Sequence, residues 1–271
     1  MKADGLYRRV HEALMCAEPD EKCRLTETLR ADWASGVLSR DATDQPPVRR
    51  IEAPGRPERP ELVPPQQVPR RRLGTEAGRA VLVHAIAHIE FNAINLALDA
   101  VYRFRDLPDA FVGDWLQVAE EEARHFRMLR ARLRELGADY GDHPAHNGLW
   151  EMALKTDHDP LVRMALVPRV LEARGLDVTP GMMQRLREAG DEATVACLEV
   201  ILADEIGHVA IGSRWFHHLC AERGLEPEAE FRRLIQAYLR GSLRGPFHVE
   251  ARRAAGFSAE EIAALEALEA P

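Results

Sequence analysis

Apolar residues recur every three or four positions along most of this chain, a period that predicts α-helices. Two short helices are expected within residues 5–38, separated at Pro19, because proline breaks a helix interior. Four longer helices are expected at about 75–105, 108–137, 159–175 and 191–224. Val, Ile and Thr never gather into alternating runs between turn residues, so strands are not expected. The pattern therefore predicts an all-α fold.

Other segments depart from this pattern. Residues 44–70 hold eight prolines and are interpreted as an extended arm that lies across the domain surface. Residues 138–158 are expected to form a long connection with at most a short helix, and 180–190 a short helical connector. Pro168 is expected to kink the third long helix. The tail over 226–271 is expected to add two or three helices.

These segments suggest three parts along the chain. Residues 1–74 contain the N-terminal helices and the Pro/Arg-rich arm, 75–224 a four-helix bundle, and 225–271 a C-terminal helical extension. The long connection inside the second part is a crossover between its second and third helices. The expected architecture is a central bundle with extra helices at both ends.

Composition limits the classes of partner. The 271 residues carry a net charge of −8, so the whole molecule is not attracted to nucleic acid or to an anionic membrane. No apolar run is expected to span a membrane, and the N-terminus does not resemble a signal peptide. The four cysteines include no C-x-x-C pair and fit reduced thiols, so a cytoplasmic protein is expected.

Each of the four long helices places one glutamate in phase with its apolar stripe. These four residues are Glu90, Glu122, Glu172 and Glu205. Buried carboxylates cost several kcal/mol each unless a cation or a proton neutralises them. The pattern therefore indicates a shared site for positive charge in the bundle core.

Two of the four glutamates begin a Glu-x-x-His motif, at Glu122–His125 and Glu205–His208. Residues three apart lie about 60° apart on a helix, so both side chains can reach one point beside the axis. Four carboxylates and two imidazoles suit two divalent first-row metal ions. Iron and manganese both accept these ligands, so the sequence leaves the choice between two Fe and two Mn open.

The order Glu, Glu-x-x-His, Glu, Glu-x-x-His over about 75–224 resembles the ferritin-like di-iron carboxylate superfamily. With the stretches HAIAHIE and AEEEARHF and the arm, the chain is most similar to an uncharacterised bacterial family of ferritin-like proteins, a domain of unknown function. The resemblance implies one ion on Glu90, Glu122 and His125 and another on Glu172, Glu205 and His208. It also implies that Glu122 and Glu205 bridge the two ions.

The resemblance favours an oxidoreductase or hydroxylase that uses O₂ or peroxide, acting on an unidentified small molecule or RNA base. Histidine in both ligand sets is more similar to the oxygenase, rubrerythrin and reductase branches than to storage ferritins. The alternatives are ferritin-like iron storage or detoxification, and a structural helical protein stabilised by metal. A homodimer is a further possibility, and the sequence does not identify the electron donor.

Further histidines and arginines lie outside the six ligands. His84 and His88 lie off the Glu90 face and are expected to have supporting or structural roles, while His143 and His146 could flank an entrance or be chance surface histidines. The segment 49–79 carries arginines that favour contacts with the protein's own acidic helices or a second subunit over RNA: Arg49, Arg50, Arg56, Arg59, Arg70, Arg71, Arg72 and Arg79.

Overall fold

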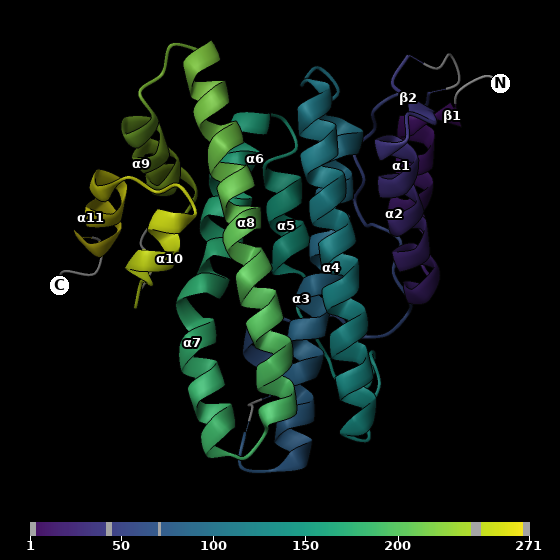
Figure 1. The fold of residues 1–271 in the computed structure, drawn as a ribbon, viewed down its shortest axis with the longest axis vertical. Helices are drawn as coiled ribbons and strands as arrows, with labels where there is room; N and C mark the ends of the chain where they lie inside the picture. The colour runs from purple at the N-terminus through teal and green to yellow at the C-terminus, as the bar shows by residue number, and fades with distance from the viewer. Residues whose placement is uncertain (1–3, 42–44, 70–71, 240–244, 268–271) are drawn as a thin grey trace. The chain divides into compact units, whose positions relative to one another are not determined.

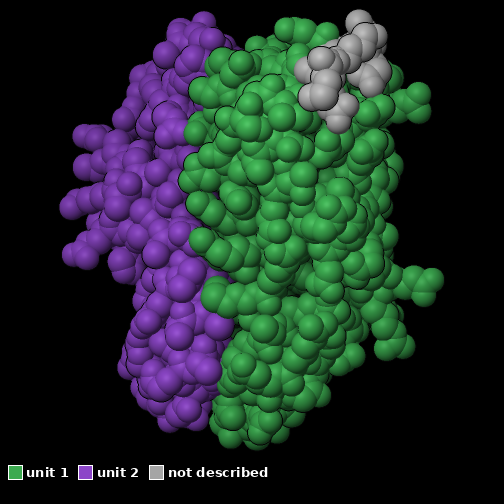
Figure 2. Space-filling view, turned by 45° about the vertical axis from the view of Figure 1, so that its right-hand side comes forward, with its two compact units in different colours: residues 1–154 green, residues 155–271 purple. Residues whose placement is uncertain are grey.

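The computed structural model describes residues 4–41, 45–69, 72–239 and 245–267, and these are mostly helical (Figure 1). The chain divides into two compact units, residues 1–154 and 155–271 (Figure 2). The predicted helical fold is confirmed. The division into three parts along the chain stays a prediction.

The first unit contains five helices among its described residues: α1 (Leu6–Met15), α2 (Pro19–Ala34), α3 (Glu76–Arg103), α4 (Asp109–Glu135) and α5 (Gly148–Lys155). The described residues also contain one pair of two-residue strands that was not expected, β1 (Asp4–Gly5) in parallel with β2 (Leu38–Ser39). Both strands have two residues, too short for a periodic signal in the sequence. A 3₁₀ turn, η1 (Pro65–Gln67), interrupts the arm.

Helices α3 and α4 form a hairpin with a short connection and lie side by side (Figure 1). Thr75 caps α3, because its side chain accepts a hydrogen bond from the Gly78 N–H at 3.1 Å. By length and composition alone α3 could cross a membrane, contrary to the expectation above. However, 89% of the apolar window is buried inside the protein, as in the core helix of a soluble protein.

Lys22 attaches the first two helices to α3. Its fully buried ammonium donates to the Ala13 and Leu14 carbonyls at 3.0 and 2.7 Å, and to Asn95 Oδ1 at 2.7 Å. Burial lowers the pKa of Lys22 to about 7. Three acceptors around one buried amine fix the end of α1 against the middle of α3.

The Pro/Arg-rich arm packs against the first unit, as expected of an extended surface segment. Its Gly55 N–H donates to the Leu14 carbonyl at 3.0 Å, and Val63 N–H to the Ala145 carbonyl at 2.8 Å. The Trp150 indole N–H donates to the Glu52 carbonyl at 3.1 Å. These contacts use backbone groups of the arm. An extended, proline-rich chain makes no internal backbone hydrogen bonds, so these groups can bind other segments.

Three arginines of the segment 49–79 have partners close to them in sequence. Arg50 pairs with Glu52 at 2.8 Å, and Arg56 and Arg79 donate to carbonyls of the same segment. The predicted contacts of Arg70 and Arg71 lie outside the described residues.

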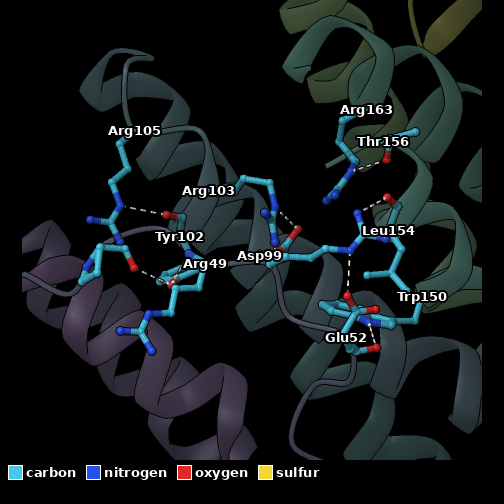
Figure 3. A network of polar contacts seen from close by, with 12 residues as sticks. Arg49, Glu52, Asp99, Tyr102, Arg103, Arg105, Trp150, Leu154, Thr156 and Arg163 are labelled. Atoms are coloured by element: carbon cyan, nitrogen blue, oxygen red, sulfur yellow. Dashed lines mark hydrogen bonds and ion pairs between the residues drawn. The ribbon is translucent and has the colours of Figure 1, made fainter. Parts of the chain in front are cut away.

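A polar network fixes the C-terminal end of α3 to the beginning of the arm (Figure 3). Arg103 binds Asp99 through two hydrogen bonds of 2.7 and 3.1 Å, and both side chains are nearly buried. The Tyr102 hydroxyl donates to the Pro47 carbonyl and accepts from the Arg49 N–H, both at 3.0 Å. The last turns of α3 are therefore held in one orientation.

The second unit contains six α-helices among its described residues: α6 (Pro160–Leu166), α7 (Ala173–Glu188), α8 (Glu192–Glu222), α9 (Pro227–Tyr238), α10 (Val249–Ala254) and α11 (Ala259–Ala267). A π-helical turn, η2 (Val167–Glu172), joins α6 to α7 without a break. The predicted end of this helix at Gly175 was wrong, because α7 continues through Gly175 and Pro180 to Glu188. The residues predicted as a separate connector belong mostly to this helix.

The sequence predicts a kink at Pro168, which stays a prediction, and the structure places Pro168 in the π-turn. Its ring is packed so closely on α8 that a Cβ added to Gly212 would lie 2.3 Å from the proline Cβ and Cγ. Proline cannot donate the regular helical hydrogen bond, and the wider π-turn accommodates that loss. Gly212 thus makes room for the turn.

This contact gives a stability prediction. We expect Gly212→Ala to destabilise the protein by about 1–3 kcal/mol, because the added methyl group must displace Pro168. The matched control is Gly207→Ala on the same helix, where an added Cβ meets nothing within 4 Å. Alanine there should stabilise α8 by about 0.5–1 kcal/mol. Urea unfolding measures both, and equal stabilities of the two variants would contradict the prediction.

Candidate metal centre

Three of the predicted ligands come together in the first unit, on the facing sides of α3 and α4. Glu90 lies in the middle of α3, and Glu122 and His125 lie one turn apart on α4. The next residues, Phe91 and Phe126, pack with their ring centroids 5.3 Å apart and so set the register of the hairpin. The helical phase read from the sequence is therefore correct for these residues.

The three side chains surround one small volume. His125 Nδ1 lies 3.1 Å from Glu90 Oε2 and 3.4 Å from Glu122 Oε2. One ligand atom from each residue lies within 4.8 Å of the others, as in a group that could hold a metal ion. Glu122 and His125 are fully buried, and Glu90 is 3% exposed. Carboxylate oxygen and imidazole nitrogen are suitable donors for first-row divalent ions.

The protonation of this group in the metal-free state follows from its burial. Burial raises the pKa of Glu90 well above its usual value, and the negative charge of Glu122 raises it further. Burial alone would lower the pKa of His125, but its hydrogen bonds to Glu122 and Glu90 outweigh that effect and raise it to about 11. The metal-free group therefore retains protons at neutral pH that a bound cation would displace.

The remaining three predicted ligands lie in the second unit. Glu205 and His208 are one turn apart on α8, both buried, with His208 Nδ1 3.6 Å from Glu205 Oε2. Glu172 ends the π-turn and is half-buried. Pro168 of the π-turn contacts Gly212 of α8, and this contact fixes how the two elements are aligned. Glu172 does not belong to any group of three His, Cys, Asp or Glu among the described residues whose ligand atoms lie within 4.8 Å of one another.

Tyr140 is a neighbour of the first ligand group that the sequence did not predict. It follows α4 in the long connection and packs on Phe91 and Phe126, with ring centroids 5.4 and 5.0 Å away. Its hydroxyl lies 2.9 Å from His88 Nδ1. A loop residue has no periodic signal, so only its place in the fold brings it to this position.

His84 and His88 contact Tyr140, and His143 and His146 contact these two histidines. His84 stacks on the tyrosine ring and accepts a hydrogen bond from the Gly141 N–H at 2.9 Å. His143 packs edge-on against His84, while the His146 carbonyl lies 3.3 Å from His88 Nε2. Burial lowers the pKa of both His84 and His88 to about 4. The predicted supporting role of His84 and His88 fits these neutral, packed rings.

Comparison with known proteins places the chain among relatives of similar length. A family model described as "Protein of unknown function (DUF455)" matches residues 15–263. An uncharacterized protein of Haemophilus influenzae is 46% identical over 264 residues, which cover 94% of this chain and 92% of that protein. No solved structure matches. The similarity therefore extends over both ligand sets and the C-terminal helices.

Proposed function

Because the chain belongs to the DUF455 family of proteins of unknown function, its activity has to be inferred from its chemistry, and we propose a metal-dependent oxidoreductase. The observation that carries this proposal is the buried group of Glu90, Glu122 and His125, whose ligand atoms lie within 4.8 Å of one another. Two buried carboxylates and an imidazole are costly to keep unless protons or a bound cation neutralise them, and their close grouping suits a cation.

The full proposal is a dinuclear centre in a ferritin-like four-helix bundle. Its first ligand set is Glu90, Glu122 and His125, and its second is Glu172, Glu205 and His208. The support for the second set is the recurrence of Glu and Glu-x-x-His in the second unit, together with the sequence resemblance described above. In this proposal Glu122 and Glu205 are the bridging carboxylates.

Iron is the proposed metal, with manganese as the alternative, because both accept mixed carboxylate and imidazole ligands. Such ions supply one-electron and O₂ chemistry when bound, while the protein determines what reaches them. In the first unit the ligand group is buried, and Phe91 and Phe126, next to Glu90 and His125 in the sequence, pack on each other and on Tyr140. An apolar surrounding of this kind suits oxidation of a substrate better than free exchange of stored ions with water.

The test is to load the protein anaerobically with Fe(II) and then add O₂ or peroxide. We expect about two Fe(II) per chain. Low-temperature Mössbauer spectra should show their conversion to a magnetically coupled Fe(III) pair after addition of the oxidant. Glu122→Ala, prepared in the same way, is the control and should not form the coupled pair. Native protein that binds iron but stays Fe(II) with both oxidants would contradict the oxidoreductase function.

A further inference from the structure

A buried arginine in the π-turn connects the second ligand set to the C-terminal helices. Arg169 is fully buried, and it lies three residues before Glu172. Its guanidinium donates to Glu261 Oε1 at 2.7 Å and to Ser213 Oγ at 3.2 Å. A buried guanidinium is tolerated only with a counter-ion and hydrogen-bond acceptors, so this turn depends on a partner from the end of the chain.

Three phenylalanines surround the same guanidinium. Its central carbon lies 4.6 Å from the ring centroid of Phe216, 4.3 Å from that of Phe231 and 4.5 Å from that of Phe257. These rings come from α8, from α9 and from the turn before α11. Cations are attracted to aromatic faces at such distances, so the rings fix the position of Arg169 as well as covering it.

The carboxylate of Glu261 is itself held in place. Ser258 and Glu261 form a capping box at the start of α11: the Ser258 N–H donates to Glu261 Oε2 at 2.9 Å and the Glu261 N–H to Ser258 Oγ at 3.1 Å. One carboxylate oxygen therefore caps α11 while the other binds Arg169. The beginning of α11 thus determines where the guanidinium can lie.

A second buried ion pair holds α7 at a position that follows Glu172 in the sequence. Arg252 in α10 binds both oxygens of Asp177 in α7, at 2.9 and 2.7 Å, and both residues are nearly inaccessible. Phe257 contacts both arginines, since the Arg252 guanidinium is 5.0 Å and that of Arg169 4.5 Å from its centroid. The C-terminal helices therefore hold α7 and its π-turn both before and after Glu172.

From this arrangement we propose that Arg169 and Glu261 are positioning residues for the proposed metal ligand Glu172. The inference rests on the proposed function. A π-turn has less regular hydrogen bonding than an α-helix, and its end residue can shift unless neighbouring contacts fix it. Pro168 is held by α8 and Arg169 by α11. Together these two contacts orient the side chain of Glu172, which follows Arg169 by three residues. The C-terminal extension is then part of the metal site's support.

The experiment removes the ion pair while keeping the fold. In the double variant Arg169→Met, Glu261→Gln, methionine still packs on the three rings and glutamine still caps α11. Replacing a buried ion pair by neutral groups of similar volume is often tolerated. Glu261→Gln alone leaves the guanidinium without its counter-ion, and exposed Glu260→Gln is the matched control. Circular dichroism and the melting temperature of the metal-free proteins establish the fold of each variant.

Anaerobic titration with Co(II), followed by visible absorption and calorimetry, gives the affinity of each ion. In the double variant we expect the first ion to bind as in native protein and the second about 10–100-fold more weakly, the usual effect of losing an outer-shell contact. Arg169→Lys, which keeps the ion pair, should retain more of the second-ion affinity. If instead affinity declined only in step with melting temperature, or the folded double variant bound both ions normally, positioning would be overturned.

Measurements on the native protein distinguish a failure of this inference from a failure of the proposed function. Native protein that binds fewer than two Co(II) ions would overturn the dinuclear centre, and this inference with it. Native protein that binds two, together with a folded double variant of unchanged affinity, would overturn only the role of Arg169 and Glu261. Glu260→Gln is expected to match native protein in every measurement.

Discussion

Removing bound metal should lower the melting temperature at pH 7 by about 5–10 °C. An ion present at 100 times its dissociation constant stabilises a folded protein by about 2.7 kcal/mol, and each kcal/mol changes the melting temperature of a protein of this size by about 2–4 °C. Thermal unfolding of chelator-treated and metal-reloaded protein measures the difference. Identical unfolding curves at pH 7 would contradict metal binding at the buried ligands.

Metal-free and metal-loaded protein should differ in how their stability depends on pH. The pKa of Glu90 is raised in the folded state, so this carboxyl group stabilises the fold when it is protonated. The stabilisation is full below the unfolded-state pKa of 4.5 and is lost as pH rises through the folded-state pKa. The raised pKa of His125 also stabilises the fold. This stabilisation is full below pH 6.5 and is lost as pH rises toward about 11. Metal-free protein should therefore become more stable as pH falls from about 8 to 6. Glu90→Gln should weaken this dependence.

The metal-loaded protein should follow the opposite trend. Ligands must lose their protons before they bind a cation, so the stabilisation by metal decreases as pH falls. The difference between the melting temperatures of loaded and metal-free protein should therefore be largest at the alkaline end of that range. A difference that grows on acidification would contradict the assignment of Glu90 and His125 as ligands.

Replacing a buried ligand should remove metal, whereas replacing its neighbour should not. Glu122 is fully buried beside His125, while Glu121 is only half-buried and accepts a hydrogen bond from Gln117. We expect Glu122→Ala to lower bound Fe(II) to well under one per chain, because this carboxylate is a proposed bridge between both ions. Glu121→Ala should retain about two. Elemental analysis after anaerobic equilibration with Fe(II) gives the counts.

The second ligand set should behave in the same way. Glu205→Ala removes the other proposed bridge and should also leave well under one ion, whereas His208→Ala removes one terminal ligand and should leave about one. If Glu121→Ala lost metal while Glu122→Ala retained it, the helical phase of α4 would be wrong. Retention of two ions by both Glu205→Ala and His208→Ala would exclude α8 from the centre.

The sequence by itself determined which residues of α3 and α4 meet. In a regular helix, position along the chain fixes the face on which a side chain lies, so the phase of Glu90, Glu122 and His125 could be read against the apolar stripe. The starts of α3 and α11 also depend on local chemistry, as the Thr75 cap and the capping box at Ser258 show. These features need no knowledge of distant residues.

Only the tertiary structure decided the features that depend on contacts between distant segments. The π-turn before Glu172 exists where Pro168 meets Gly212, and a regular helical period does not predict it. Tyr140 reaches the ligand helices from a loop without periodicity. Arg169 would be placed on the surface from its charge alone, yet it is buried, because its counter-ion Glu261 arrives from 92 residues further along the chain. Burial of a charge depends on a partner that no local pattern can supply.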